Sequence, residues 1–141
     1  MKGMINMYNF KEVEKKWQDK WFNEKSFKAI DFHPTKPKYY VLYEFYNISG
    51  NLHMGHLKGT VPVYALSRMK RLQGYNVLFQ IGEDAFGLTA ENTAIKTGIN
   101  PEDFGKNGTN YIMELQSRRL EFLFYLDRTI CASDPSYYKW T

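Results

Sequence analysis

The stretch YYVLYEFYNISGNLHMGHLKG, residues 39–59, decides the fold because it runs from a strand pattern through a turn into a helix pattern. It opens with aromatic and aliphatic residues that favour a strand, which we expect to end near Tyr46. Turn-forming residues fill positions 47–51. From Met54 onward, apolar residues recur at helical spacing, at Leu57, Val61, Ala65, Met69 and Leu72.

Two histidines lie where that helix should begin. His53 and His56 are three residues apart, so on a helical turn both side chains project to the same side. A helix N-terminus offers free backbone N–H groups and the positive end of a dipole, which suits a phosphate group, and Gly55 leaves room for a ligand. The residues alone also allow helix capping and packing. A metal site is not expected, because further ligands at suitable spacing do not occur.

The composition indicates one globular domain over residues 1–141. Hydrophobic residues make up 43% of the chain, with 11 Tyr, 10 Phe and 3 Trp, which excludes a disordered chain. The net charge of +4 permits a nucleotide partner. A lone cysteine, Cys131, favours a reducing compartment, and the chain has neither an apolar run of membrane length nor a signal-peptide core at its start. We therefore expect a cytoplasmic protein without a membrane partner.

Residues 1–37 are expected to form a helix and a connector. An amphipathic pattern over residues 7–27 predicts a helix, which Asn9 would cap and which Trp17 and Trp21 would pack against the core. Two prolines between residues 31 and 38 indicate the connector.

Residues 38–141 are expected to hold a strand–helix–strand unit and further helices, an α/β fold. The first helix should run to Gln73 and end at Gly74, with Pro62 either kinking it near Lys58 or delaying its regular part to Thr60. A second buried strand over residues 76–81 should pair with the first in parallel.

The rest of the chain carries two acids and more helix patterns. Glu83 and Asp84 should follow the second strand, next to the histidine turn; the alternative is two exposed loop acids. A short helix capped by Thr89 or Asn92 and a long helix over residues 109–126 should follow. A final helix would begin at Ser133 or Asp134, before Pro135, and the chain would stop inside it.

Several blocks resemble the class I aminoacyl-tRNA synthetases, most closely the leucyl-tRNA synthetase family. YNFKEVEKKWQDKW resembles the opening helix of that family, LHMGH its HIGH motif, and DPSYYKWT the segment before its editing insertion. The stretch RLQGYNVLFQIGEDAFGLTAENTAIKTG resembles the family pattern RMxGYNVLxPxGWDAFGLPAENxAIKxG. Together these blocks span nearly the whole chain.

The resemblance implies the first half of a Rossmann-type catalytic domain. Such a domain binds ATP with Mg²⁺ and joins it to leucine or a similar amino acid, which gives an aminoacyl-adenylate. His53 and His56 would be catalytic, donating hydrogen bonds to the phosphates as charge migrates. The residues implied for ATP binding are Gly50, Asn51, His53, Gly55 and His56, and those implied for the amino acid are Phe45, Asn47 and Asp84.

Some positions depart from the family pattern. Asn47 stands where leucine enzymes have the tyrosine of a PYPSG turn, Glu83 replaces the tryptophan of GWDAFG, and Thr89 replaces a proline. Two alternatives therefore accompany a leucine-activating enzyme. One is a catalytically inactive nucleotide-binding relative with a regulatory or partner-binding role, and the other is a small HxGH nucleotidyltransferase.

The chain lacks a KMSKS-like block, whose lysines neutralise the triphosphate in such enzymes. The resemblance therefore implies the N-terminal half of a catalytic domain, and a short parallel unit would leave a sheet edge and an apolar face uncovered. We expect a complementary C-terminal half or a second copy as partner. Contact with tRNA is expected only through domains outside these residues.

Overall fold

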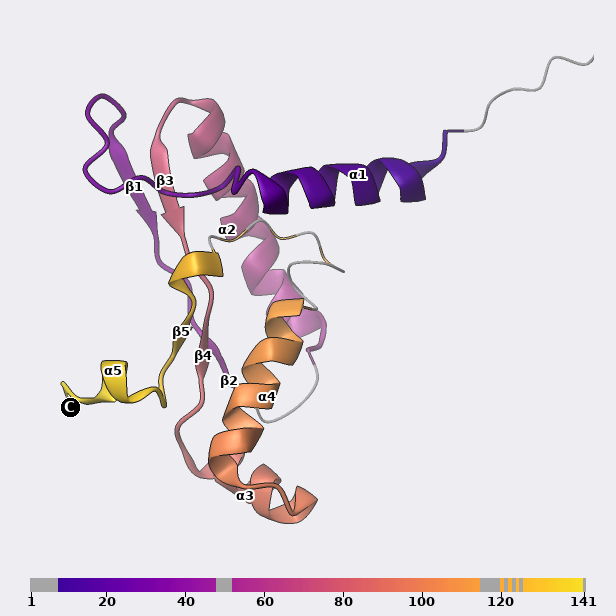
Figure 1. Ribbon diagram of the computed structural model, residues 1–141, viewed down its shortest axis with the longest axis vertical. Helices are drawn as coiled ribbons and strands as arrows, with labels where there is room; N and C mark the ends of the chain where they lie inside the picture. Colours follow the sequence, from indigo (N-terminus) through magenta and orange to yellow (C-terminus); the bar gives the residue numbers. More distant parts are fainter. Residues whose placement is uncertain are drawn as a thin grey trace, which may run out of the picture.

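The computed structural model describes residues 8–47, 52–114, 120, 122, 124 and 126–140. It confirms an α/β fold, in which β1 and β3 lie at one end of the strand layer and β2, β4 and β5 at the other (Figure 1). The elements in chain order are α1 Phe10–Asn23, β1 Lys38–Val41, β2 Tyr46–Asn47, α2 Met54–Leu72, β3 Asn76–Phe79, β4 Gly82–Asp84, α3 Leu88–Thr97, α4 Pro101–Glu114, the 3-10 helix η2 Leu126–Arg128, β5 Ile130–Cys131 and α5 Pro135–Tyr138.

The strands of the described residues all pair in parallel, which confirms the predicted pairing. Strand β1 pairs with β3 from Lys38 opposite Asn76, and β4 lies between β2 and β5. The partner numbers differ by 38 in the first pair (76 − 38) and by 37 in the second (83 − 46). Residues 42–45 therefore hold one residue more than the opposite segment 80–82, and the single strand predicted through Tyr46 is two strands with a break between them.

Helix α2 begins at Met54, where the sequence predicts it, and contacts both β1 and β3. Gly74 follows the helix with a φ of 89°, a conformation that suits glycine, and this confirms the predicted end. Pro62 lies inside the helix. Of the two alternatives for this proline, a regular part that starts only at Thr60 is therefore wrong.

The main core lies between strands β1 and β3 and the residues Phe122 and Phe124. Two of its members, Phe122 and Phe124, are buried and two residues apart, a spacing typical of extended chain, and the ring centroids of Phe79 and Phe124 are 4.8 Å apart. The buried residues of this core are Val41, Val77, Phe79, Ile81, Phe122 and Phe124.

The long helix predicted over residues 109–126 is confirmed only for residues 109–114, which belong to α4; residues 115–119 lie outside the described residues, and residues 120, 122 and 124 are not helical. Helix α4 begins at Pro101, because the side-chain oxygen of Asn100 accepts a hydrogen bond from the N–H of Glu102 at 2.9 Å, and it ends at Glu114. Helix α5 begins where the sequence predicts, with Asp134 as its cap and a proline in its first turn. Within the described ranges, no helix combines the length and apolar character needed to cross a membrane.

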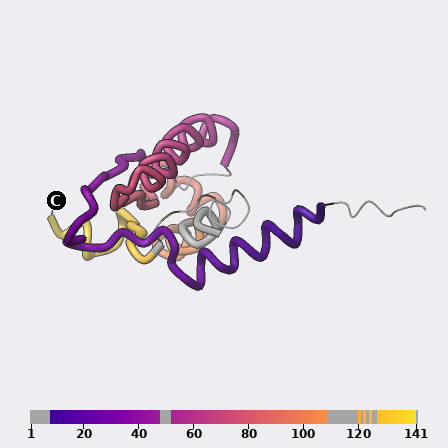
Figure 2. Tube along the Cα trace, turned by 90° about the horizontal axis from the view of Figure 1, so that it is seen from above, coloured from indigo at the N-terminus to yellow at the C-terminus, as the bar shows by residue number. Residues whose placement is uncertain are grey.

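Helix α1 starts after Asn9, whose side chain caps it as predicted, but it does not pack against the core. None of its residues is buried, and Trp17 is 41% exposed. Figures 1 and 2 show the helix extending away from the rest of the chain. Only its C-terminal part reaches the body, where the Arg68 guanidinium lies 6.0 Å from the Trp21 ring centroid. The predicted packing through both tryptophans is therefore wrong for Trp17.

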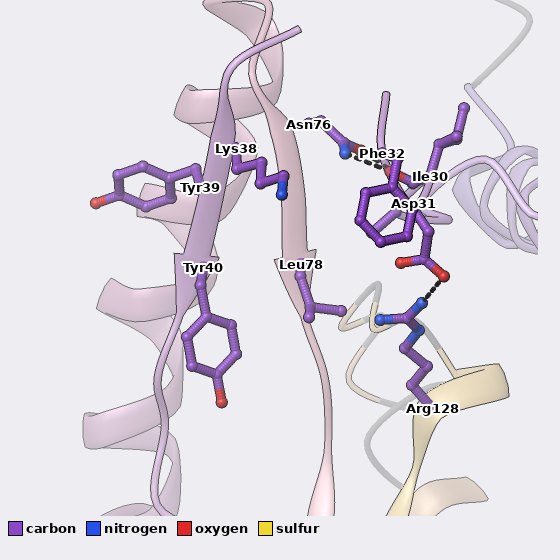
Figure 3. Close-up of a pocket in the computed structure, with 10 residues that line it drawn as sticks. Ile30, Asp31, Phe32, Lys38, Tyr39, Tyr40, Asn76, Leu78 and Arg128 are labelled. Atoms are coloured by element: carbon purple, nitrogen blue, oxygen red, sulfur yellow. Dashed lines mark hydrogen bonds and ion pairs between the residues drawn. The ribbon is translucent and has the colours of Figure 1, made fainter. Parts of the chain in front are cut away.

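Hydrogen bonds and an ion pair hold the connector at the amino ends of β1 and β3 (Figure 3). The side-chain amide of Asn76 accepts from the Ile30 N–H at 3.0 Å and donates to the Ile30 carbonyl at 2.7 Å. Arg128 pairs with Asp31, and a pocket of about 190 Å³ lies among these residues. Ligands of open α/β sheets bind at the opposite, carboxyl end, so we interpret these contacts as a structural clasp.

Candidate functional site

The histidine turn, residues 53–56, is a helix cap built from two imidazoles. His53 is the N-cap of α2, and its Nδ1 accepts a hydrogen bond from the N–H of Gly55 at 3.1 Å. The Nδ1 of His56 accepts one from the N–H of His53 at 3.0 Å, and the two ring centroids are 4.0 Å apart. The capping that the sequence allowed as an alternative is therefore present, and it fixes the orientation of both rings.

The same capping leaves one nitrogen of each ring for a ligand. A neutral imidazole whose Nδ1 accepts a hydrogen bond carries its proton on Nε2. His53 and His56 therefore each present an Nε2–H donor at the start of α2. Two such donors at a helix N-terminus match the acceptor oxygens of a phosphate group.

The His56 imidazole is electrically neutral at pH 7. Burial lowers the pKa of His56 below its ordinary value of 6.5, and the neighbouring His53 lowers that pKa further. A ligand at this ring would therefore meet the N–H dipole rather than a positive charge.

A cluster of three hydroxyl groups supports the first turn of α2, and sequence reasoning missed it. Thr60 is fully buried, and its Oγ1 lies within hydrogen-bond distance of both the Tyr43 hydroxyl and the His56 carbonyl oxygen, at 3.0 Å from each. Tyr46 shares this cluster through its contact with Thr60, and its ring meets that of His56 edge-on at 4.8 Å. The four-residue spacing of His56 and Thr60 was the available signal, because it places both on one helix face.

Two glycines of α2 make room for side chains of the site. A Cβ on Gly55 would lie 2.8 Å from Cε1 of His53, so the space that we predicted for a ligand holds the His53 ring. A Cβ on Gly59 would lie 2.9 Å from the Tyr43 hydroxyl. Both glycines therefore allow close packing around the turn.

Glu83 lies in β4 and not beyond the end of a strand, and the alternative of two exposed acids is also wrong for it. Its side chain is 0% exposed, and among the described residues neither carboxyl oxygen has a hydrogen-bond partner. Burial raises the pKa of Glu83 to about 8. The group is therefore mostly protonated at pH 7.

The residues that the resemblance implies for amino-acid binding share the other face of the sheet. Asn47 is paired in register with Asp84, and both are exposed, whereas Tyr46 and Glu83 form the neighbouring pair. Because side chains alternate along a strand, these two pairs lie on opposite faces. The Phe45 ring lies against Gly82, where a Cβ would be 2.6 Å from its Cζ. The structure thus brings Phe45, Asn47 and Asp84 together.

Two of the predicted ATP-binding residues, Gly50 and Asn51, lie outside the described residues. The described ranges contain no cluster of three or more His, Cys, Asp or Glu that could hold a metal ion.

A pocket of about 720 Å³ lies at the carboxyl ends of β4 and β5, and its lining does not include either histidine. The Phe86 and Tyr138 rings, which are 5.6 Å apart, form part of this lining.

The fold and the histidine turn agree with what the sequence matches. The family described as "tRNA synthetases class I (M)" matches residues 39–128, which include β2, β3, β4, all of β1 but its first residue, and the whole histidine turn. The chain belongs to this family of aminoacyl-tRNA ligases.

Within the family, the chain is similar to enzymes named leucine–tRNA ligase. It is 48% identical over 136 residues to the one from Cytophaga hutchinsonii and 47% identical over 135 residues to the one from Parabacteroides distasonis. Each match covers 95% of this chain and 14% of the relative, so the chain spans about one seventh of their length.

Solved structures give the same picture. The LeuRS of Agrobacterium radiobacter, in a ternary complex with tRNA and LeuAMS, matches with a TM-score of 0.82 and 33% identity over 92% of this chain and 16% of that one. The methionyl-tRNA synthetase of Mycobacterium tuberculosis, in complex with methionyl-adenylate, matches with a TM-score of 0.66 and 26% identity over 73% of this chain and 20% of that one. These likenesses confirm the predicted Rossmann-type synthetase fold.

Proposed function

We propose that this chain builds the histidine-turn side of a site that activates leucine, forming leucyl-adenylate from ATP and leucine. The main observation in support of this proposal is the pair of Nε2–H donors that His53 and His56 present at the start of α2. The names of the relatives support leucine as the amino acid. The adenylate compounds in the complexes of both structural neighbours support an adenylate as the product.

In the proposed reaction, the leucine carboxylate attacks the α-phosphorus of ATP, and pyrophosphate leaves with the electrons of the broken P–O bond. ATP enters as its Mg²⁺ complex. His53 and His56 donate hydrogen bonds to phosphate oxygens that gain negative charge during the attack. Gly50 and Asn51, just before the turn, remain predicted ATP contacts, whereas Gly55 would act through the room that it leaves for the His53 ring.

Leucine is assigned to the face of the sheet that carries Asn47 and Asp84, at the carboxyl ends of β2 and β4. The exposed Asp84 carboxylate would bind the leucine ammonium group, Phe45 would offer an apolar surface, and Asn47 would border the site. Glu83 adds no charge here, because its side chain lies on the other face and is protonated at neutral pH.

The complete reaction is proposed to need further protein. The sequence has no KMSKS-like block, whose lysines neutralise the triphosphate in the enzymes that it resembles, and its relatives are about seven times longer. A complementary C-terminal half, or a second copy of this chain, would supply the missing surface. Transfer of the leucyl group to tRNA is assigned to that larger assembly.

Amino-acid-dependent exchange of pyrophosphate into ATP tests the proposal. It would be measured on the chain alone and with a supplied C-terminal half, for wild type and His56→Ala. His33→Ala is a matched control, because His33 also caps a turn through its Nδ1, at 3.0 Å from the N–H of Lys36, but lies in the connector. Leucine-dependent exchange that His56→Ala abolishes and His33→Ala retains supports the proposal.

Two other outcomes would contradict it. Nucleotide binding without exchange in either setting would favour an inactive nucleotide-binding relative. Transfer of a nucleotide to a phosphorylated small molecule would favour a small nucleotidyltransferase.

A further inference from the structure

Glu83 is a buried carboxyl group that the proposed reaction does not use. Its side chain is 0% exposed, and both of its oxygens lack hydrogen-bond partners within the described part of the chain. An ionised carboxylate in such a place costs several kcal/mol unless a cation or donors compensate it. Glu83 therefore does not serve as a surface charge.

The strand pairing places Glu83 next to Tyr46, which contacts the histidine turn. Glu83 is the register partner of Tyr46 on β2, and the Tyr46 ring lies edge-on against the His56 ring at 4.8 Å. The Tyr46 hydroxyl contacts Thr60 and donates to the His56 carbonyl at 3.3 Å. Tyr46 thus connects the buried acid to the residue that presents a donor to the ligand.

Within the described part of the chain, the titratable groups next to Glu83 supply no positive charge. The neighbour of Glu83 on β2 is Tyr46. Its pKa is raised by burial, by Tyr43 and by Glu83, so its hydroxyl keeps its proton. The neighbour of Glu83 on β5 is Cys131, its other register partner. The neutral His56 lies on α2, on the far side of Tyr46. The stable form of Glu83 in this surrounding is the protonated acid, in agreement with the rise of its pKa to about 8.

We propose that Glu83 is a positioning residue for nucleotide binding, which as a neutral acid lets Tyr46 hold the histidine turn and which on ionisation releases that turn. A buried carboxylate must gain water or a donor, and Tyr46 is the hydroxyl-bearing side chain beside it. If the hydroxyl or ring of Tyr46 moves toward Glu83, its contacts with Thr60 and His56 are lost. The inference deepens the proposed function and rests on it.

Calorimetric titration with MgATP between pH 7 and 9.5 tests the inference, above the range where phosphate groups take up protons. We expect the wild-type Kd to rise about tenfold per pH unit once the pH exceeds the Glu83 pKa of about 8, because only the protonated form binds well. Glu83→Gln, which keeps the shape without the charge, should bind with a flat profile. Cys131→Ser controls for the thiol across β5 and should keep the wild-type profile.

A second measurement needs no ligand. In protein labelled with ¹³C at the glutamate carboxyls, the Glu83 signal should titrate near pH 8, and the His56 Nε2 signal should shift at the same pH. Titration near the ordinary value of 4.5, or an unmoved His56 signal, would overturn the inference even if Glu83→Gln fails to fold.

The two proposals fail in different ways. A flat wild-type binding profile, or identical profiles for wild type and Glu83→Gln, would overturn the role of Glu83 and leave the proposed function intact. Failure of every variant to bind MgATP at pH 7 would contradict the proposed function, and the carboxyl titration would then decide the inference alone.

Discussion

Tyr46 and Glu83 are register partners across β2 and β4, and their side chains share the face of the sheet from which Tyr46 contacts α2. The next pair, Asn47 and Asp84, lies on the opposite face. An acid in place of the family tryptophan therefore does not place two charges side by side. Glu83 is part of the support behind the histidine turn, and Asp84 remains available to a ligand.

The free energy of unfolding should depend on pH through Glu83. Its pKa is about 8 in the native protein and near the ordinary 4.5 in the unfolded chain, so between these values the native state keeps a proton that the unfolded state loses. Stability should therefore fall with rising pH across that window, by roughly 1.4 kcal/mol per unit from this group, and level off above pH 8. Urea unfolding at pH 5, 6.5 and 8 should show this contribution in wild type and lose it in Glu83→Gln. Equal pH slopes in the two proteins would contradict the assignment.

Thr60→Val should lower the free energy of unfolding by about 1–3 kcal/mol, because it removes a fully buried hydroxyl that is hydrogen-bonded among the Tyr43 hydroxyl and the His56 carbonyl. Thr60→Ser keeps the hydroxyl and should cost about 1 kcal/mol for the lost methyl group. Chemical denaturation of both variants measures the difference. If the serine variant is the less stable of the two, the hydroxyl cluster does not hold the turn.

The cap and ligand roles of His53 should separate by substitution. His53→Ala removes the acceptor for the Gly55 N–H and should cost about 1 kcal/mol of stability, whereas His53→Asn should retain the cap, since asparagine is a favourable N-cap residue. Both variants lack the Nε2–H donor, so both should bind MgATP more weakly than wild type. Thermal unfolding and calorimetric titration measure the two effects. Wild-type affinity in His53→Asn would show that the ring serves only as a cap.

Gly82→Ala should displace the Phe45 ring, because a Cβ at this position would lie 2.6–2.7 Å from three of its carbon atoms. We expect a loss of about 1–3 kcal/mol in stability from this overpacking. A double-mutant cycle with Phe45→Ala provides the control, since the cost of the alanine should largely vanish once the ring is absent. Additive effects of the two substitutions would place Phe45 elsewhere.

The parts of the fold that were predicted correctly have strong local signals. Helix α2 and its end at Gly74 follow from the apolar period and from the left-handed conformation that glycine adopts. The helix predicted over residues 109–126 extended too far toward the C-terminus, because Phe122 and Phe124 are buried and two residues apart, a pattern of extended chain. The start at Pro101 was signalled by Asn100 before the proline, and the prediction missed it.

The site was harder to predict because it depends on pairing across strands. The spacing of His53 and His56 located the turn, but only the register shows that Glu83 lies behind Tyr46 and that Asn47 joins Asp84. The break at residues 42–45 sets that register, and a one-residue shift exchanges the faces of every side chain after it. The caps proposed for α3, Thr89 and Asn92, were wrong because Gly87 occupies the N-cap position, without a side-chain hydrogen bond.

In the proposed reaction, the histidine turn presents two Nε2–H donors to the phosphates of ATP. Long-range ¹H–¹⁵N NMR of the imidazoles, with and without MgATP, tests it most directly. Before addition, His53 and His56 should both show the Nε2–H form that their Nδ1 hydrogen bonds require, and MgATP should shift both Nε2 signals while leaving His33 unchanged. Unmoved His53 and His56 signals at saturating MgATP, or a proton on Nδ1 of either ring, would contradict the account.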